Sequence, residues 1–126
     1  IGFNEPLSAL MSRTREKALT PSTIEQNKAM FGGDPDCVPR RAITMGIGTI
    51  LEAKSCLMLV TGVDKAEVLA RAVEGPITAM VTASALQLHP RCRVIVDEAA
   101  AGQLRGTDYY RWIFENEPEW EAFRRC

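Results

Sequence analysis

The sequence lacks most of the residue patterns that define metal sites, disulfide scaffolds and membrane spans. It has one histidine, His89, and four cysteines without a Cys-x-x-Cys pair (Cys37, Cys56, Cys92 and Cys126), so it offers too few ligands for a zinc site. No apolar run approaches the roughly 20 residues that span a bilayer, and nothing resembles a signal peptide. We therefore expect a cytoplasmic protein with free thiols and no bound metal.

An excess of charge of one sign is also missing. The chain has 15 basic and 16 acidic residues and a net charge of -1, which excludes a general attraction to nucleic acid or to an anionic membrane. What is present is typical of a globular protein: 126 residues, 46% hydrophobic and 25% charged. This length fits one domain, and any anion must be bound by a local group of residues.

The N-terminal part alternates polar and apolar segments. Residues 12–20 fit an exposed strand or extended arm, and residues 21–31 fit a helix with Ser22 or Thr23 as its N-cap. A loop should follow over residues 32–39. Residues 40–53 then predict a short strand, a Gly-x-Gly turn and a helix that ends near Ala53.

The C-terminal part has stronger signals. Residues 55–62 and 91–98 are apolar runs typical of strands buried on both faces, and these two strands contain Cys56 and Cys92. Three segments favour helices: residues 63–75, with Asp64 as N-cap and Val68, Leu69, Ala72 and Val73 on one face; residues 76–89; and residues 107–123, interrupted at Pro118.

Strands that alternate with helices at these lengths predict an α/β fold, a Rossmann-like, doubly wound and mostly parallel sheet with helices on both faces. Three sheet-forming apolar runs are few for such a fold. We therefore expect residues 1–126 to be the C-terminal portion of a single larger α/β domain whose N-terminal half is missing.

Several motifs occur in one order along the chain: GFNEP, SRTR, AITMGIGTIL, TGVDKAEVLARAVEG, and SALQLHP leading into VIVDE. With these motifs the chain resembles the C-terminal half of the glucosamine-6-phosphate deaminases, also called glucosamine-6-phosphate isomerases, from Ile1 to about Glu98. The resemblance implies conversion of glucosamine 6-phosphate and water to fructose 6-phosphate and ammonia, in the catabolism of N-acetylglucosamine. General acid–base groups suffice for this reaction, so no cofactor is expected.

The resemblance places one catalytic residue in this chain. Glu5 matches the Glu of the family's FNEP segment, which holds and polarises the histidine that opens the sugar ring. That histidine and an active-site aspartate directly precede FNEP in the family, and the base that moves the C2 proton lies further upstream. The isolated chain should therefore be inactive. The alternative interpretation of Glu5 is a residue that caps a turn or pairs with an arginine.

Lys65 is the expected contact for the substrate phosphate. It lies just after the strand of residues 55–62, at the start of a helix, where free backbone N–H groups favour an anion. The family's equivalent lysine contacts the phosphate. The alternative is a solvated lysine in the first helical turn.

The arm over residues 7–17 matches an allosteric site of bacterial hexamers in the family. Ser8, Arg15 and Lys17 fall on positions that bind N-acetylglucosamine 6-phosphate there, and two cations two residues apart on an extended segment point to one side. The alternative is a solvated basic edge that only discourages strand pairing. We expect a homo-oligomer, hexameric in many relatives, with no nucleic-acid or membrane partner.

The sequence also departs from the family pattern. Ala9 and Ala18 replace a common Ser and Thr, and Ala29 stands where the family has a phosphate-binding Arg. Lys28 is a potential substitute, but one residue along a helix turns the side chain by about 100°. The poorly matching residues beyond Glu98 support no assignment for the family's allosteric tyrosine.

Two further features are interpreted as structural. His89 lies between an apolar run and Pro90, and Gly46 and Gly48 are close-packing glycines at a helix start, since the dinucleotide fingerprint is incomplete. Two other functions remain open: a phosphogluconolactonase or another sugar-phosphate isomerase on the same fold, and a non-catalytic sugar-phosphate-binding regulatory module.

Overall fold

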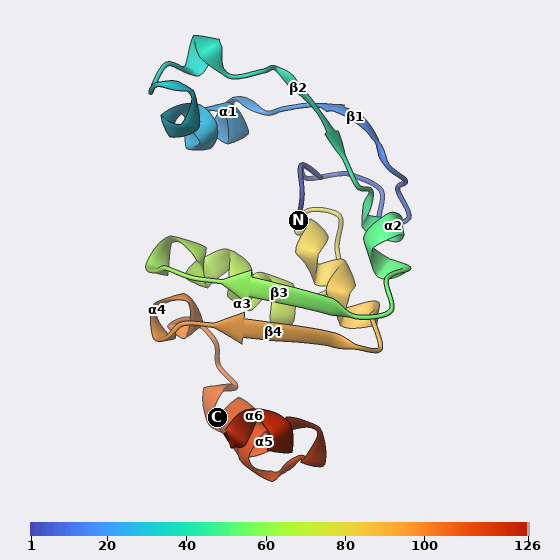
Figure 1. Cartoon of the computed structure of the whole chain (residues 1–126), viewed down its shortest axis with the longest axis vertical. Helices are drawn as coiled ribbons and strands as arrows, with labels where there is room; N and C mark the ends of the chain where they lie inside the picture. Colours follow the sequence, from blue (N-terminus) through green and yellow to red (C-terminus); the bar gives the residue numbers. More distant parts are fainter. Residues whose placement is uncertain (126) are drawn as a thin grey trace.

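The computed structural model describes residues 1–125, which form two small sheets and a series of short helices (Figure 1). The first half of the chain contains β1 (Arg15–Ala18), α1 (Pro21–Asn27), η1 (Lys28–Phe31), η2 (Pro35–Cys37), β2 (Arg41–Thr44) and α2 (Ile47–Leu51). Strands β1 and β2 pair antiparallel, with Arg15 opposite Thr44 and Ala18 opposite Arg41. This pair confirms the expected arm strand and adds an antiparallel element to the fold.

The second half of the chain holds a parallel pair. It contains β3 (Cys56–Val60), η3 (Val63–Lys65), α3 (Ala66–Val73), η4 (Thr82–Leu88), β4 (Cys92–Val96), α4 (Glu98–Ala101), α5 (Thr107–Asn116), η5 (Pro118–Trp120) and α6 (Glu121–Arg124). Strands β3 and β4 run parallel, with Cys56 opposite Cys92 and Val60 opposite Val96. The α/β class expected from the sequence is confirmed by this strand–helix–strand unit.

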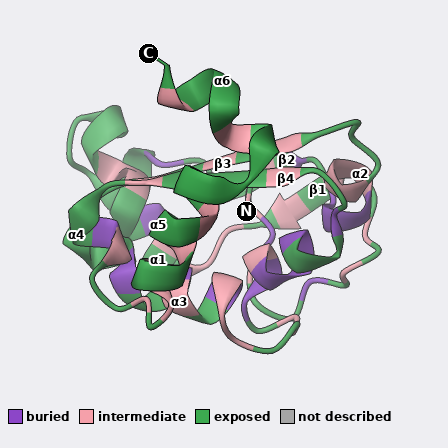
Figure 2. Cartoon of the chain, turned by 90° about the horizontal axis from the view of Figure 1, so that it is seen from below, coloured by how far each residue is buried: buried purple, intermediate pink, exposed green. Residues whose placement is uncertain are grey.

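The core lies on one side of the β3–β4 sheet. Its buried apolar side chains come from both halves of the chain: Ile24, Val38, Ile47, Ala66, Leu69, Ala72, Val81, Ala85, Leu86 and Ala100. In Figure 2 the buried residues gather around α2, α3 and the segment that contains η4, whereas the C-terminal helices are mostly exposed. Helix α3 packs mainly against η4 and α4.

The prediction that β3 is buried on both faces is wrong for this chain. Leu57 and Leu59 are 60% and 66% exposed, and Ile95 on β4 is 50% exposed. Side chains alternate between the two faces of a strand, so these three residues share the face opposite Met58 and Val94. Cys56 and Cys92, on the same face as Met58, are only half-buried.

Several predicted helix boundaries also change. Thr20 caps α1 instead of Ser22 or Thr23, because its Oγ1 accepts a hydrogen bond from Thr23 N–H. Asp64 caps nothing: residues 63–65 form a 3₁₀ turn, and α3 begins at Ala66 with no side-chain cap. Val68 is 43% exposed and does not join Leu69 in the core.

The helix expected over residues 76–89 is a shorter 3₁₀ helix, η4. Ser84 Oγ accepts from Thr78 N–H and donates to Thr78 C=O, so residues 78–84 form a turn that a helix would have to break. The interruption at Pro118 is confirmed, since α5 ends before it and η5 begins on it. No helix among the described residues is long and apolar enough to cross a membrane.

The glycines of the Gly-x-Gly turn pack closely, as expected. A Cβ on Gly46 would lie 2.0 Å from the backbone oxygen of Ser12, and one on Gly48 would lie 2.8 Å from the backbone of Met11. Ser12 Oγ also accepts from Ile47 N–H. The arm is thereby held directly against the start of α2.

The C-terminal helices are anchored by one carboxylate. Glu74 accepts hydrogen bonds from the N–H groups of Arg105 and Gly106 and from the hydroxyl of Tyr110. The two backbone hydrogen bonds hold the pKa of Glu74 below its ordinary value, while burial and this carboxylate raise the pKa of Tyr110 to about 12. The loop before α5 is thus fixed to the end of α3.

Candidate active site and its surroundings

The N-terminal segment is fixed to the rest of the chain by a buried asparagine. Asn4 Nδ2 donates to the carbonyls of Ile1 and Met45, at 2.9 and 2.8 Å, and Asn4 Oδ1 accepts from Arg15. Phe3 N–H also donates to Thr44 Oγ1. The residue that follows, Glu5, is therefore carried by a segment pinned between the ends of β1 and β2.

Glu5 is bound by the first turn of α1. Its Oε1 accepts from Thr23 Oγ1 at 2.6 Å, from Thr20 N–H at 3.1 Å and from Thr20 Oγ1 at 3.2 Å. Partial burial tends to raise the pKa of Glu5, but these hydrogen bonds and the charge of Lys17 outweigh it and hold the pKa below its ordinary value. Glu5 is therefore an oriented and ionised carboxylate at neutral pH.

All three donors use the same oxygen of Glu5. In the described part of the chain no hydrogen bond is recorded for Oε2, the second carboxylate oxygen. A carboxylate held through one oxygen can accept a proton donor, such as an imidazole N–H, through the other. The hydrogen bonds by which Glu5 caps the turn thus use only Oε1. Within the described chain Oε2 remains available to accept a hydrogen bond from a catalytic group.

The three expected allosteric residues are not joined to one another by any hydrogen bond recorded in residues 1–125. Arg15 donates to Asn4 Oδ1 and to Arg13 C=O, whereas Lys17 acts on the charge of Glu5. Ser8 is 4% exposed, and its Oγ is buried without a hydrogen-bond partner in the described chain. Arg15 and Lys17 do share the half-buried side of β1, as their spacing predicts.

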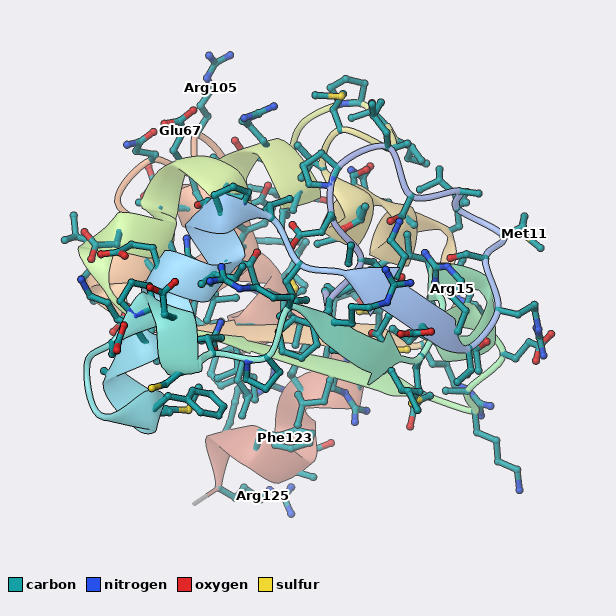
Figure 3. All side chains as sticks on the ribbon, turned by 90° about the horizontal axis from the view of Figure 1, so that it is seen from above. Met11, Arg15, Glu67, Arg105, Phe123 and Arg125 are labelled. Carbon is teal, nitrogen blue, oxygen red and sulfur yellow. The ribbon has the colours of Figure 1, made fainter. Side chains whose placement is uncertain are left out.

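Lys65 lies at the opposite sheet, beyond the carboxyl end of β3. It is exposed, occupies the N-cap position of α3, and has no ion pair or hydrogen bond from its side chain within the described residues. Figure 3 shows Arg15 on the arm far across the molecule from Glu67, which lies two residues after Lys65. The expected phosphate contact and the expected allosteric residues therefore belong to separate regions.

The position of the missing phosphate-binding arginine is solvent-exposed. Ala29 lies in η1, and the neighbouring Lys28 forms an ion pair with Glu25 one turn earlier. Lys28 is thus paired with the preceding helix α1, and among the described residues it makes no hydrogen bond or ion pair with Glu5.

His89 is buried and satisfied by backbone groups. Its Nε2 lies 2.8 Å from Ala53 C=O, and its Nδ1 accepts from Arg91 N–H, so the proton belongs on Nε2. Both ring nitrogens are used to tie the loop after α2 to the start of β4. This arrangement agrees with the structural interpretation of His89.

Sequence reasoning missed three residues around the site. Of the residues that bind Glu5, Thr23 was seen only as a cap candidate for a helix and Thr20 only as the last residue of the arm. Asp97, which directly follows β4, was seen only within the VIVDE motif. Asp97 accepts from Gly62 N–H with both carboxylate oxygens, at 3.1 and 3.0 Å, and caps α4 through Ala100 N–H at 2.7 Å. A sequence cannot show that residues 62 and 97 are adjacent.

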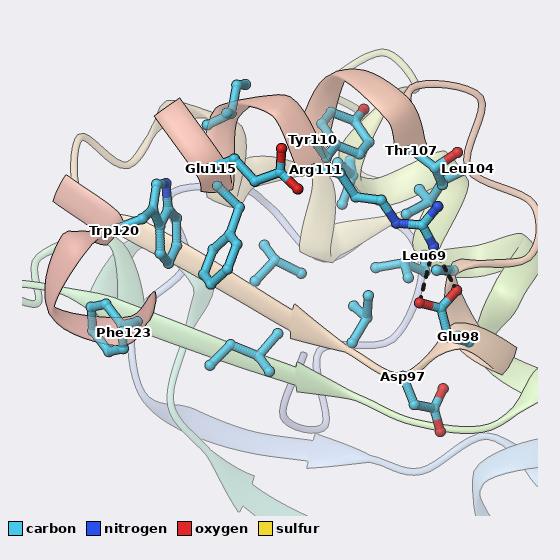
Figure 4. Close-up of a pocket in the computed structure, with 17 residues that line it drawn as sticks. Leu69, Asp97, Glu98, Leu104, Thr107, Tyr110, Arg111, Glu115, Trp120 and Phe123 are labelled. Atoms are coloured by element: carbon cyan, nitrogen blue, oxygen red, sulfur yellow. Dashed lines mark hydrogen bonds and ion pairs between the residues drawn. The ribbon is translucent and has the colours of Figure 1, made fainter. Parts of the chain in front are cut away.

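A cavity of about 540 Å³ lies elsewhere, between β4, α3 and the C-terminal helices (Figure 4). Its walls are mainly apolar, with Leu69, Val94, Phe114 and Trp120 among them, and a bidentate ion pair of Arg111 with Glu98 closes one end. None of the expected site residues lines it. Glu5 and Lys65 therefore remain the candidates for chemistry. Within residues 1–125 no cluster of three metal-ligating side chains is present.

Comparisons with known proteins agree with the resemblance seen in the sequence. The chain is 53% identical over 122 residues to a glucosamine-6-phosphate deaminase of Streptomyces coelicolor, covering 97% of this chain and 47% of that protein. The corresponding protein of Corynebacterium urealyticum is 51% identical over 123 residues, 98% of this chain and 48% of its own length. No family model matches the chain.

A solved structure shares the fold. It is described as a monomeric glucosamine-6-phosphate deaminase of the NagB superfamily, and it superposes with a TM-score of 0.77 at 42% identity, covering 80% of this chain and 42% of that chain. The expected resemblance and fold are therefore confirmed. The chain spans about half the length of the curated relatives it matches.

Proposed function

We propose that this chain, whose sequence matches about half of a glucosamine-6-phosphate deaminase, is part of a protein that converts glucosamine 6-phosphate and water to fructose 6-phosphate and ammonia. The observation that carries the proposal is 53% identity along nearly the whole chain. All the relatives named above are glucosamine-6-phosphate deaminases. A lactonase or a non-catalytic binding module has no comparable support.

In this reaction Glu5 acts on the group that opens the sugar ring. A carboxylate that accepts the N–H of an imidazole fixes its tautomer and stabilises the imidazolium formed when the imidazole takes the proton of the anomeric hydroxyl. The imidazolium then gives a proton to the ring oxygen as the bond between that oxygen and C1 breaks and the C1 carbonyl forms. Glu5 suits this role because it is held ionised by Thr20 and Thr23 and has one oxygen unoccupied in the described chain. The histidine and the base for the C2 proton come from the rest of the parent protein.

Lys65 binds the substrate phosphate. An exposed ammonium at the carboxyl end of a parallel strand, unpaired among the described residues, is available to an anion. Its pairing with phosphate would be a charge-assisted hydrogen bond, the stronger kind in proteins.

The test is Glu5→Gln in the full-length protein. Gln keeps the size of the side chain but removes the charge that stabilises an imidazolium, so ammonia release should fall by about 100-fold or more, within the range for general acid–base groups. The free energy of unfolding should change little. Unchanged turnover would overturn the role of Glu5, and absence of deamination in the unmodified protein would overturn the function.

We extend the proposal to regulation and assembly. Ser8, Arg15 and Lys17 would form a second site for N-acetylglucosamine 6-phosphate in a cytoplasmic homo-oligomer, with the buried and unpartnered Ser8 Oγ as one ligand. Activation by that sugar phosphate should disappear in Arg15→Ala. Light scattering of the full-length protein tests the oligomer, and a monomer, as the solved relative is described, would contradict it.

A further inference from the structure

The turn that carries Lys65 is attached to the neighbouring strand by a single side chain. Residue Asp97, directly after β4, binds Gly62 N–H with both carboxylate oxygens, at 3.1 and 3.0 Å. Asp97 N–H in turn donates to Val60 C=O, the last residue of β3. Asp97 therefore joins the carboxyl end of β4 to the carboxyl end of β3 and the turn that follows it.

A short path of hydrogen bonds leads from Asp97 to Lys65. The N–H of Gly62 is bound by the carboxylate, and the C=O of Gly62 accepts from Lys65 N–H at 3.1 Å. Gly62 has a φ of +88°, a left-handed conformation that favours glycine. The carboxylate thus fixes the N–H of Gly62, and the C=O of the same residue accepts from the backbone of Lys65, just before α3 begins.

The carboxylate of Asp97 accepts hydrogen bonds from backbone N–H groups and does not pair with the ammonium group of Lys65. Its oxygens accept from Gly62 and, at 2.7 Å, from Ala100 at the start of α4, and no ion pair joins Asp97 to Lys65 in the described chain. The ammonium of Lys65 stays available to an external anion. A direct Asp–Lys pair would instead compete with a phosphate.

We infer that Asp97 is a positioning residue for the phosphate-binding Lys65, acting through the backbone of Gly62. This inference rests on the proposed function, because it assigns Asp97 to the same substrate site. Asp97 touches neither substrate nor reacting atoms. Its effect should therefore appear in the binding of the phosphate group and not in the chemical steps.

The test uses Asp97→Ser in the full-length protein. Serine is as good an N-cap as aspartate and keeps the bond to Ala100, but its short side chain cannot span to Gly62. We expect KM for glucosamine 6-phosphate to rise about 3- to 10-fold with kcat within about twofold, and the inhibition constant of inorganic phosphate to rise in parallel, as a weakened charge-assisted contact requires. Asp108→Ser, on an exposed residue of α5, is the matched control.

Two further measurements distinguish a positioning role of Asp97 from a purely structural role. Turnover of glucosamine without its phosphate should be the same in Asp97→Ser and the unmodified protein, since the phosphate contact is absent. In a Lys65→Ala background, Asp97→Ser should cause no further rise in KM, because its only route to the phosphate is gone.

The outcomes distinguish the two proposals. If Lys65→Ala raises KM and Asp97→Ser does not, or if Asp97→Ser lowers turnover of both substrates equally, the inference about Asp97 is wrong while the proposed function stands. If Lys65→Ala leaves KM unchanged, the phosphate assignment of Lys65 fails, and the role of Asp97 falls with it.

Discussion

At the scale of single residues, the state of Glu5 is decided by its neighbours. An exposed glutamate is ionised at neutral pH in any case, but three hydrogen bonds to one oxygen also fix its direction. Thr23 makes the shortest of them, at 2.6 Å. The two threonines thereby turn an ordinary acid into an oriented one.

Thr23→Ala should raise the pKa of Glu5 toward its ordinary value, because the shortest of the hydrogen bonds that lower it is lost. Carbon-13 NMR of the Glu5 carboxyl measures the change, and Ser22→Ala, on the exposed neighbouring residue, is the control. An unchanged Glu5 titration in Thr23→Ala would contradict the assignment.

The lowered pKa of Glu5 also predicts how the stability of the folded protein depends on pH. Because the pKa of Glu5 is lower in the folded than in the unfolded chain, its contribution is present above the unfolded pKa of about 4.3 and is lost as the pH falls through the folded pKa. Thr23→Ala should therefore cost about 1 kcal/mol at pH 7 and less in acid. Urea unfolding at the two pH values checks this.

At the scale of elements, the arm is positioned by the start of α2. Gly46 has no room for a side chain, since a Cβ would lie 2.0 Å from Ser12 C=O, and that oxygen belongs to backbone that cannot turn aside. The arm in turn carries the segment with Arg15 and Lys17. A change at this glycine should therefore displace β1 as well as α2.

Gly46→Ala should destabilise the protein by about 1 to 3 kcal/mol, as overpacking does. Gly102→Ala is the control: a Cβ there meets its nearest neighbour at 3.4 Å, and the backbone is right-handed, so its cost should be small. Thermal or urea unfolding of the pair measures the difference. Equal stability of the two variants would contradict the prediction, because it would show that the arm shifts away from α2 to make room for the added methyl group.

At the scale of the whole molecule, one face of the β3–β4 sheet is only partly covered, because Trp120 and Phe123 pack over Arg93 on it. Leu57, Leu59 and Ile95 stand on it side by side, each at least half exposed. Contiguous apolar surface of this kind drives association. The chain alone is therefore expected to associate through this face.

Leu59→Lys should make the isolated chain more nearly monomeric, because a charge in the centre of the face must be desolvated when two copies meet. Sedimentation velocity over a range of concentrations measures the change. Met11→Lys, at a 77% exposed loop position away from the sheet, is the control. Association that persists in Leu59→Lys but disappears in Met11→Lys would place the contact on the arm instead.

The parts of this protein that follow local rules could be predicted from the sequence. The strand of residues 12–20, the strands that contain Cys56 and Cys92, the helix with Leu69 and the break at Pro118 all follow from hydrophobic spacing and from proline's missing N–H. The motifs also predicted the resemblance, which the comparisons confirm. Where a helix starts was less predictable, since capping depends on which hydroxyl or carboxylate lies close to the free N–H groups.

The tertiary structure alone decided what lies beside each candidate residue. The binding of Glu5 by Thr20 and Thr23, the contact of His89 with Ala53, and the contact of Asp97 with Gly62 join residues that are 15 to 36 positions apart. The exposure of Leu57 was equally hidden, because an apolar run has the same pattern whether one face or both are covered. Sequence patterns thus determined the residue types and local elements of this protein, and long-range packing determined which of those residues meet.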